Sequence, residues 1–251
     1  MEHHDAAQPL SPRTRVVALG RPERVPGAPL NPPVTFTSTY IQDGPVNYAR
    51  VDNPTWTPFE EAVGELEGGD ALLYSSGMAA VQAALSLVPV GGTVVAPAAA
   101  YNGVVVTLTE AQRDGRLAVR WVDVTDSAAT IAALPGADLL WLESPSNPLL
   151  EVADIAALTD AAHEAGALVV VDNTFATPLL QRPLEDGVDV ADRDPGAGRP
   201  AVQVRAQARG VHGGERVPGH PVAHRLAEGG LLIVGHGRDV EGHRGRGQGQ
   251  A

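Results

Sequence analysis

The sequence has 251 residues, of which 43% are hydrophobic, so the chain is long enough to form one large domain with a substantial buried core. Its net charge of -12 at pH 7 argues against nucleic-acid binding, because contacts with phosphates need a basic surface, and it favours chemistry on small molecules. The absence of cysteine excludes disulfide bonds, thiolate metal ligands and a cysteine nucleophile.

Residues 1–56 have the character of an N-terminal arm. Up to residue 33 they are rich in Pro, Arg and Gly, which favours an extended segment that reaches a neighbouring subunit over an element of the core. The start (MEHHD) has no basic region followed by an apolar stretch, and no apolar run in the sequence is long enough to span a bilayer. We therefore expect a cytoplasmic protein that is not bound to a membrane.

The first helix of the main domain is predicted to begin at Thr57. Thr57 is expected to be its N-cap, with Pro58 at the first helical position and Glu60 closing a capping box. Two glycines, Gly68 and Gly69, are expected to end it.

Five short apolar runs follow, each of a length that suits a buried strand: residues 71–74, 93–96, 119–122, 138–142 and 167–171. Helical stretches separate most of them. The clearest covers residues 154–165, where Asp154 can cap the helix and Gly166 ends it. Strands that alternate with helices indicate crossover units, so we expect an α/β domain with a mainly parallel sheet over residues 57–190.

The composition changes abruptly near Val190. Residues 1–190 hold 24 acidic residues and 9 arginines, whereas residues 191–251 hold 6 and 9. The second segment is rich in Gly, Arg, His, Pro and Gln, and only residues 231–234 offer a run that could be a strand. We interpret it as a largely disordered tail, and favour out-of-frame translation of a GC-rich gene over an Arg/Gly tail that contacts RNA.

In such sheets the ligand lies beyond the carboxyl ends of the strands. Four polar clusters stand there: residues 75–78 (SSGM), 97–101 (PAAAY), 143–148 (ESPSNP) and 172–174 (DNT). The first lies between a strand and a helix, where backbone N–H groups and the helix dipole favour a phosphate, although a plain turn fits equally. It matches neither nucleotide-binding glycine pattern.

The other clusters have two interpretations each. Asp172 follows a buried strand and could pair with a protonated ring nitrogen, or cap the turn before Thr174. Tyr101 could offer an aromatic face to a ligand, or be a core tyrosine. Prolines on both sides of Asn147 fix a turn that could hold its amide against a ligand oxygen, or form a structural Asx turn. A hydrolase or metal site made of Glu143 and Asp172 is a weaker alternative, because no histidine cluster supports it.

Together, and in this order, the clusters resemble the Cys/Met-metabolism PLP (pyridoxal-phosphate) enzymes, the family of cystathionine gamma-synthase, cystathionine gamma-lyase, methionine gamma-lyase and the acylhomoserine sulfhydrylases. The resemblance covers residues 30–190 and rests on residues 47–55 (NYARVDNPT), 75–80 (SSGMAA), 143–148 (ESPSNP) and 171–178 (VDNTFATP). It implies the large domain of PLP-dependent transferase fold type I, the aspartate-aminotransferase-like fold, incomplete at its C-terminal end. It also implies PLP as cofactor, an amino-acid substrate and a homodimer or homotetramer.

The resemblance assigns roles to individual residues. Gly77 and Met78, next to Ser76, would give backbone N–H groups to the cofactor phosphate, and Tyr48 and Arg50 would reach the same phosphate from the neighbouring subunit. The ring would be held by five further residues. Tyr101 would stack on it and assist proton transfer, Asn147 would lie by its hydroxyl group with Glu143 nearby, Asp172 would keep its nitrogen protonated, and Thr174 would support it. No metal ligand is implied.

One part of the family pattern is missing. The family continues with a His-Ser-x-Thr-Lys stretch whose lysine forms the Schiff base, but residues 191–200 (ADRDPGAGRP) stand there and the sequence contains no lysine. Arginine cannot replace it, because the guanidinium stays protonated. Two hypotheses follow: a PLP-dependent lyase or transferase of sulfur amino acids or O-acylhomoserine by lineage, and a truncated, inactive homologue that binds PLP weakly or pairs with other subunits. For this polypeptide we favour the second, and we expect poor solubility because the sheet would lack later strands.

Overall fold

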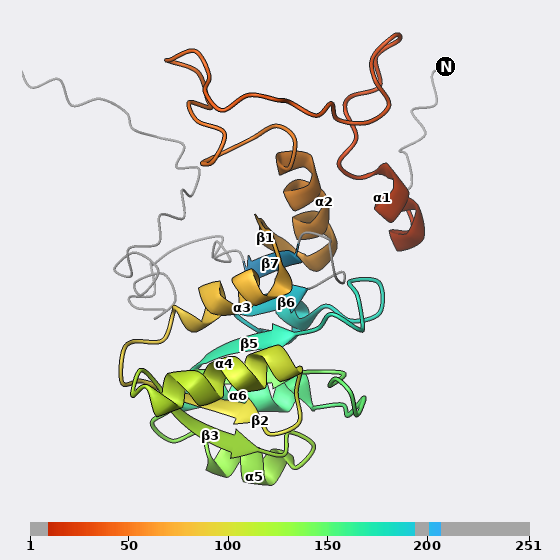
Figure 1. Ribbon diagram of the computed structural model, residues 1–251. Coiled ribbons are helices and arrows are strands. Elements are labelled where there is room, and N and C mark those ends of the chain that lie inside the picture. Colours follow the sequence, from red (N-terminus) through yellow and green to blue (C-terminus); the bar gives the residue numbers. More distant parts are fainter. Residues whose placement is uncertain (1–9, 194–200, 207–251) are drawn as a thin grey trace, which may run out of the picture.

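The computed structural model describes residues 10–193 and the backbone of residues 201–206. One sheet has the strand order β1-β7-β6-β5-β4-β2-β3, with helices on both faces (Figure 1). The strands are β1 (Gly69–Tyr74), β2 (Thr93–Pro97), β3 (Ala118–Val122), β4 (Leu139–Glu143), β5 (Leu168–Asp172), β6 (Val190–Arg193) and β7 (Ala201–Ala206). The helices are α1 (Pro12–Ala18), α2 (Thr57–Glu67), α3 (Gly77–Leu85), α4 (Asn102–Arg113), α5 (Ser127–Ala132), α6 (Ile155–Glu164) and the 3-10 helix η1 (Pro183–Asp186).

The α/β architecture predicted from the sequence is confirmed. Each of the five apolar runs is a strand, with bounds that differ from the prediction by at most two residues. Strands β3, β2, β4, β5 and β6 run parallel to one another, and β7 is antiparallel to both β1 and β6. Because two antiparallel pairings restore the strand direction, β1 also runs parallel to β6, and its carboxyl end lies at the same edge of the sheet.

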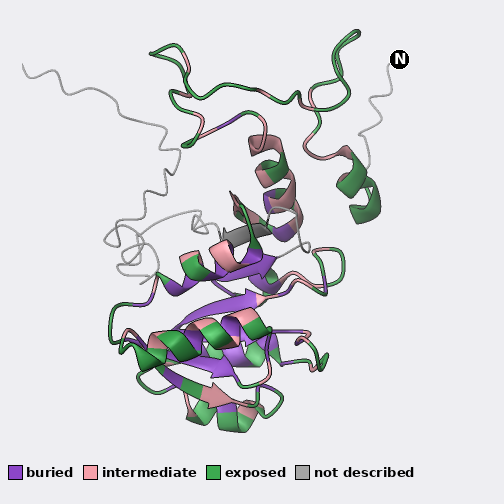
Figure 2. Cartoon of the chain, viewed as in Figure 1, coloured by how far each residue is buried: buried purple, intermediate pink, exposed green. Residues whose placement is uncertain are grey.

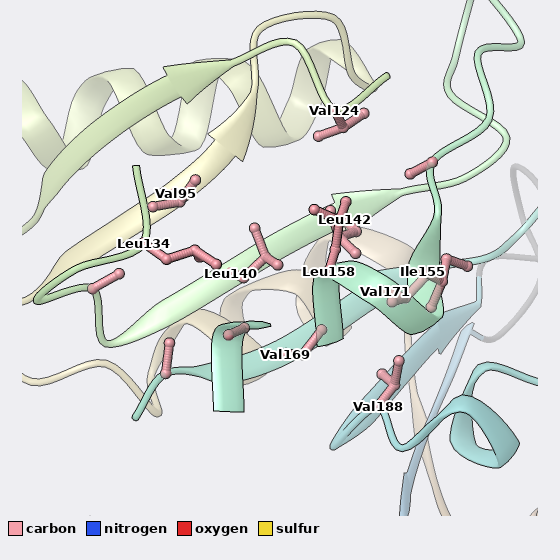
Figure 3. Close-up of a cluster of buried hydrophobic side chains, with 14 of the residues drawn as sticks. Val95, Val124, Leu134, Leu140, Leu142, Ile155, Leu158, Val169, Val171 and Val188 are labelled. Carbon is pink, nitrogen blue, oxygen red and sulfur yellow. The ribbon is translucent and has the colours of Figure 1, made fainter. Parts of the chain in front are cut away.

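The central strands are buried on both faces, which explains why they are continuous apolar runs in the sequence. Successive side chains of a strand point to opposite faces. Leu139 and Trp141 of β4 therefore pack in one cluster with α3 and α4, whereas Leu140 and Leu142 pack in a second cluster with α6. Figure 2 shows the central strands as the buried centre of the molecule, and Figure 3 shows the second cluster.

Ile155 provides a measure of how tightly this second cluster is packed. The side chain is 3% exposed on the inner face of α6 (Figure 3), whereas Ile131 on α5 is 41% exposed. We expect Ile155→Val to lower the free energy of unfolding by about 1 kcal/mol, and Ile131→Val to change it by less than about 0.5 kcal/mol. Urea unfolding of both variants measures the difference, and equal effects would contradict the packing.

Helix α6 follows the sequence prediction closely. Asp154 is its N-cap and accepts a hydrogen bond from Ala157 N at 3.2 Å. Gly166, with a φ of +80°, follows the helix in the left-handed conformation that glycine adopts without strain. His163 is exposed on this helix, and its Nε2 lies 3.0 Å from Asp189 Oδ2.

Helix α2 has the predicted extent, but the predicted capping box is wrong. Trp56 is the N-cap residue and makes no side-chain cap, and the Thr57 hydroxyl donates instead to Asp52 Oδ1 at 3.0 Å. The Glu60 carboxylate accepts a hydrogen bond from Leu73 N on β1 at 2.7 Å. The reason is tertiary: β1 is the edge strand, and an amide at an edge needs a partner outside the sheet.

The arm is less extended than its composition indicated. Residues 12–18 form helix α1, which Ser11 caps through its side chain. Arg15 of α1 forms an ion pair with Glu65 of α2 at 2.7 Å. Pro12 at the start of α1 explains the difference, because proline fits the first helical position. The rest of the arm loops beyond α2, apart from the sheet (Figure 1).

Strand β7 was not expected from the sequence, which offered only residues 231–234 as a possible strand in the tail and predicted that the sheet would lack its later strands. The backbone of residues 201–206 fills the position between β1 and β6. Strand β6 itself runs to Arg193, past the change in composition near Val190. The run at residues 231–234 lies outside the described residues. The division into an arm (1–56), a domain (57–190) and a tail (191–251) therefore stays a prediction, as does poor solubility.

No helix within the described residues is long and apolar enough to cross a membrane. Nor does that part of the chain contain a group of three or more His, Asp or Glu side chains that could hold a metal ion.

Candidate active site at the carboxyl edge of the sheet

Three carboxylates lie in register at the carboxyl ends of adjacent strands. Glu143, the last residue of β4, pairs with Asp172, the last residue of β5, and Asp172 pairs with Asp192 of β6. Glu143 and Asp192 are buried, whereas Asp172 is half-buried. The parallel sheet thus brings together acidic groups that are far apart in the sequence, at the edge where the sequence predicted a ligand site.

The start of helix α3 faces the same edge, because it follows the carboxyl end of β1. Ser76 is the N-cap, and its Oγ accepts a hydrogen bond from Ala79 N at 3.2 Å. The amides of Gly77 and Met78 are the first two of the helix and have no acceptor within it. This arrangement gives N–H groups and a positive dipole end that suit an anionic group.

Tyr101 begins helix α4 close to Met78. An ideal Cβ built on Gly103 would lie 2.6 Å from Met78 Sδ and 2.8 Å from Tyr101 Cε1, so both side chains border the space above this glycine. Tyr101 is 44% exposed, which excludes the alternative of a core tyrosine. Gly103 borders the candidate site, and the sequence did not single it out.

Glu143 contacts two of the other predicted residues. Its Oε2 accepts a hydrogen bond from Tyr101 N at 2.7 Å, and its Oε1 accepts one from Asn147 N at 2.6 Å. Burial raises the pKa of Glu143 to about 7, and the nearby Asp172 carboxylate adds to the shift, while the two N–H donors oppose it. Glu143 therefore binds backbone and is positioned beneath the edge, at 3% exposure.

Asp172 caps a turn, as one of the two interpretations predicted. Its Oδ1 accepts a hydrogen bond from Thr174 N at 3.0 Å. The turn fixes the carboxylate of Asp172 at the edge of the sheet, next to Glu143 in the strand register. Pairing of Asp172 with a ring nitrogen stays a proposal.

Asn173 links the two loops that follow β4 and β5, a role that the sequence did not indicate. It is fully buried, and its Nδ2 donates hydrogen bonds to Ser144 O and to Gln181 Oε1, both at 2.6 Å. Within the described part of the chain, Asn173 Oδ1 has no hydrogen-bond partner. Ser144 in turn accepts from Ala153 N at 3.1 Å, so the Glu143 loop is held from both sides.

Arg193 ends β6 with its guanidinium buried beside the site. It forms an ion pair with Glu67, which is 0% exposed at the end of α2, and donates hydrogen bonds to Asn173 O and to Gln181 O. Burial raises the pKa of Glu67, and Arg193 opposes that shift. No pattern in the sequence indicated this pair, because its members are separated by 126 residues.

Tyr48 and Arg50 lie in the arm and not at the edge of the sheet. Arg50 donates a hydrogen bond to Tyr48 Oη at 2.7 Å, and its guanidinium carbon lies 5.1 Å from the centre of the tyrosine ring. The arm lies beyond α2, apart from β4 and β5 (Figure 1). Within one chain these two residues are paired with each other, and a role across a subunit boundary stays a prediction.

The comparisons with known proteins identify the lineage of this site. The model of the Cys/Met metabolism PLP-dependent enzymes matches residues 13–193. The chain belongs to this family. The match ends at Arg193, the last residue of β6, so it covers each of the ten predicted site residues.

Relatives within the family bear names from transsulfuration. A putative cystathionine gamma-lyase of Streptomyces coelicolor is 44% identical over 186 residues, which are 70% of this chain and 47% of that protein. A cystathionine beta-lyase of Coxiella burnetii is 38% identical over 186 residues, 70% of this chain and 48% of that protein. The chain thus spans about half the length of the curated relatives it matches.

Solved structures confirm the fold. A cystathionine gamma-lyase from Micromonospora echinospora has a TM-score of 0.73 at 37% identity, over 80% of this chain and 56% of that one. A cystathionine gamma-synthase from Xanthomonas oryzae, in complex with cystathionine, has a TM-score of 0.75 at 32% identity over the same shares. The domain is therefore a large domain of the PLP-dependent transferase type, present in part.

Proposed function

We propose that this chain is the cofactor-binding part of a PLP-dependent lyase or transferase that acts on sulfur amino acids or O-acylhomoserine. The observation that carries the proposal is the meeting, at one sheet edge, of a helix N-terminus, an exposed aromatic ring and a half-buried carboxylate: Ser76–Met78, Tyr101 and Asp172. The names of the relatives, cystathionine gamma-lyase, gamma-synthase and beta-lyase, support the substrate class.

The groups present suit non-covalent binding of PLP. The amides of Gly77 and Met78 would hold the phosphate, and Tyr101 would stack on the ring. Asp172 would keep the ring nitrogen protonated, with Thr174 beside it, and Asn147 would lie by the ring hydroxyl. When bound, PLP supplies an electron sink for a substrate carbanion.

This sequence does not contain the group that would tether PLP covalently. The sequence has no lysine, so no side chain offers the primary amine that an imine with PLP requires. We propose that the 251-residue polypeptide binds PLP without a covalent bond and does not turn substrate over. The full activity of the lineage would require residues that this sequence does not contain.

The arm fits a role in a second subunit. Tyr48 and Arg50 are paired with each other, and the arm that carries them loops beyond α2, apart from the sheet (Figure 1). In a homodimer or homotetramer, we propose that these two residues would reach the phosphate held by the partner's α3.

Asp172→Asn tests the ring contact. Asparagine can still accept the hydrogen bond from Thr174 N, so the turn is kept and only the charge is lost. We expect PLP to bind about tenfold to a hundredfold more weakly, the usual effect of losing a charge-assisted hydrogen bond. Asp160→Asn, an exposed position on α6, is the matched control and should leave the affinity unchanged.

Equilibrium dialysis measures the affinity, and borohydride reduction followed by peptide mapping tests for a tether. An unchanged affinity in Asp172→Asn would contradict the assigned contact. A reduced PLP label on a side chain of the unmodified protein, or turnover without a companion chain, would overturn the proposal of non-covalent binding. Mapping separates such a label from one on the N-terminal amine.

A further inference from the structure

We propose that Glu143 is a positioning residue, whose buried carboxylate fixes the backbone of Tyr101 and of Asn147 and so orients their side chains at the sheet edge. The family resemblance placed Glu143 among the groups near the cofactor. The geometry assigns it a different task, beneath the site. Its importance for PLP rests on the proposed function, but the contacts themselves do not.

The two carboxylate oxygens of Glu143 serve separate segments. Oε2 accepts from Tyr101 N, 42 residues earlier in the sequence, and Oε1 accepts from Asn147 N, four residues later, at 2.7 and 2.6 Å. These distances are at the short end for hydrogen bonds from N–H groups and match those of charge-assisted bonds. One side chain thus joins the start of α4 to the loop after β4.

The location of Glu143 restricts direct contact between its carboxylate and a ligand. It is the last residue of β4, a strand that is buried throughout, and the side chain is 3% exposed. Each oxygen already accepts one backbone donor, and at 3% exposure little of the side chain is open to a ligand. Buried polar groups that lose a partner are expensive, which favours a fixed arrangement.

The same geometry explains why a carboxylate stands here. The Tyr101 amide lies at the N-terminal end of α4, a 12-residue helix whose dipole favours a negative group. Two N–H donors converge on this point, and a carboxylate accepts both. A glutamine would place its NH2 group against one of them, and two donors repel each other.

The link extends to the phosphate side of the site. Met78 of α3 and the Tyr101 ring both border Gly103, so a shift of the Tyr101 backbone would move the ring relative to Met78. Glu143 therefore fixes the backbone that carries the Tyr101 and Asn147 side chains, and the Tyr101 ring lies near Met78 at the start of α3.

Glu143→Gln in the full chain tests the proposal without any cofactor. We expect amide hydrogen exchange at Tyr101 and Asn147 to become at least about tenfold faster, with little change in the central residues of β4 and β5. Glu151→Gln is the matched control, because it removes one carboxylate from the same loop, where Glu151 bonds to Ser146 through its backbone N–H and carbonyl groups. It should leave both amides protected.

Glu143→Asp separates charge from reach. It keeps the carboxylate but is one methylene shorter, so it cannot span both donors, and we expect at least one of the two amides to lose protection. If Glu143→Gln leaves both amides protected, or if exchange rises equally throughout β4 and β5, the proposal is overturned.

A measurement on the unmodified chain covers the case in which the variants do not fold. Burial raises the pKa of Glu143 to about 7, and the charged group that adds to the shift is Asp172 on β5. The NMR shifts of the Tyr101 and Asn147 amides should therefore move together near that pH. If the two amide shifts do not change near that pH, or change independently of each other, the proposal is overturned.

PLP affinity is the last measurement. If the chain binds PLP, Glu143→Gln should weaken binding by about tenfold while Glu151→Gln does not, and unchanged binding in Glu143→Gln would contradict an orienting role. If the unmodified chain binds no PLP, the proposed function fails, whereas the amide measurements still decide the role of Glu143.

Discussion

Arg193→Ala is expected to lower the free energy of unfolding by about 3–5 kcal/mol, the range found when one member of a buried ion pair is removed. The guanidinium lies between α2 and the loop after β5, where it meets Glu67 and two backbone carbonyl groups. Without Arg193, the buried carboxylate of Glu67 loses the cation with which it is paired. The pKa of Glu67, already raised by burial, would rise further, so the loss of stability caused by the substitution should grow as the pH increases.

Urea unfolding at neutral pH measures this effect, and two variants serve as controls. Glu67→Leu combined with Arg193→Met removes both charges and should recover most of the lost stability, because no unpaired charge remains. Arg113→Ala breaks an exposed pair with Asp114 and should have little effect. A double variant as unstable as Arg193→Ala would show that the carbonyl contacts of Arg193 dominate, contrary to this expectation.

Glu143 should make the stability of the chain depend on pH. Its pKa rises from 4.5 to about 7 on folding, so between these values the folded state binds more protons than the unfolded state. The free energy of unfolding therefore falls as the pH rises through this window, by about 3 kcal/mol from this one group. The contribution is fully present below the unfolded pKa and is lost above the folded one.

The difference between the unmodified chain and Glu143→Gln isolates this term, because other carboxyl groups with raised pKa values, such as Glu60 and Glu67, are common to both. Urea unfolding at about pH 5 and about pH 8 should show a smaller loss of stability in Glu143→Gln than in the unmodified chain. Glu151→Gln should retain the full loss. Equal pH dependence in all three proteins would contradict the raised pKa.

The two effects meet at the same place in the fold. Arg193 holds the loop after β5 through Asn173 O, and Asn173 in turn holds the loop after β4 through Ser144 O. Glu143 then joins that second loop to α4. The candidate site thus rests on a continuous set of buried polar contacts, in which each loop depends on side chains from another element.

Much of this protein could be predicted from the sequence because the signals are local. The strands at residues 93–96 and 167–171 are short apolar runs bounded by Gly, Pro or Asp, and the side chain of Asp154 caps the start of α6. The edge that carries the site follows from parallel strands, which end together. Short motifs around Met78, Asn147 and Asp172 were sufficient to identify the family.

Other features depend on contacts between distant segments, and these only the tertiary structure decided. The capping box predicted at Thr57 does not form, because the Glu60 carboxylate accepts a hydrogen bond from the Leu73 amide at the edge of β1. The position of β7 between β1 and β6 and the buried pair of Glu67 with Arg193 have no local signal, since a strand or a polar residue reveals its partner only once the chain has folded. For the same reason the sequence could place Glu143 at the site, but only the fold shows that its two oxygens bind backbone.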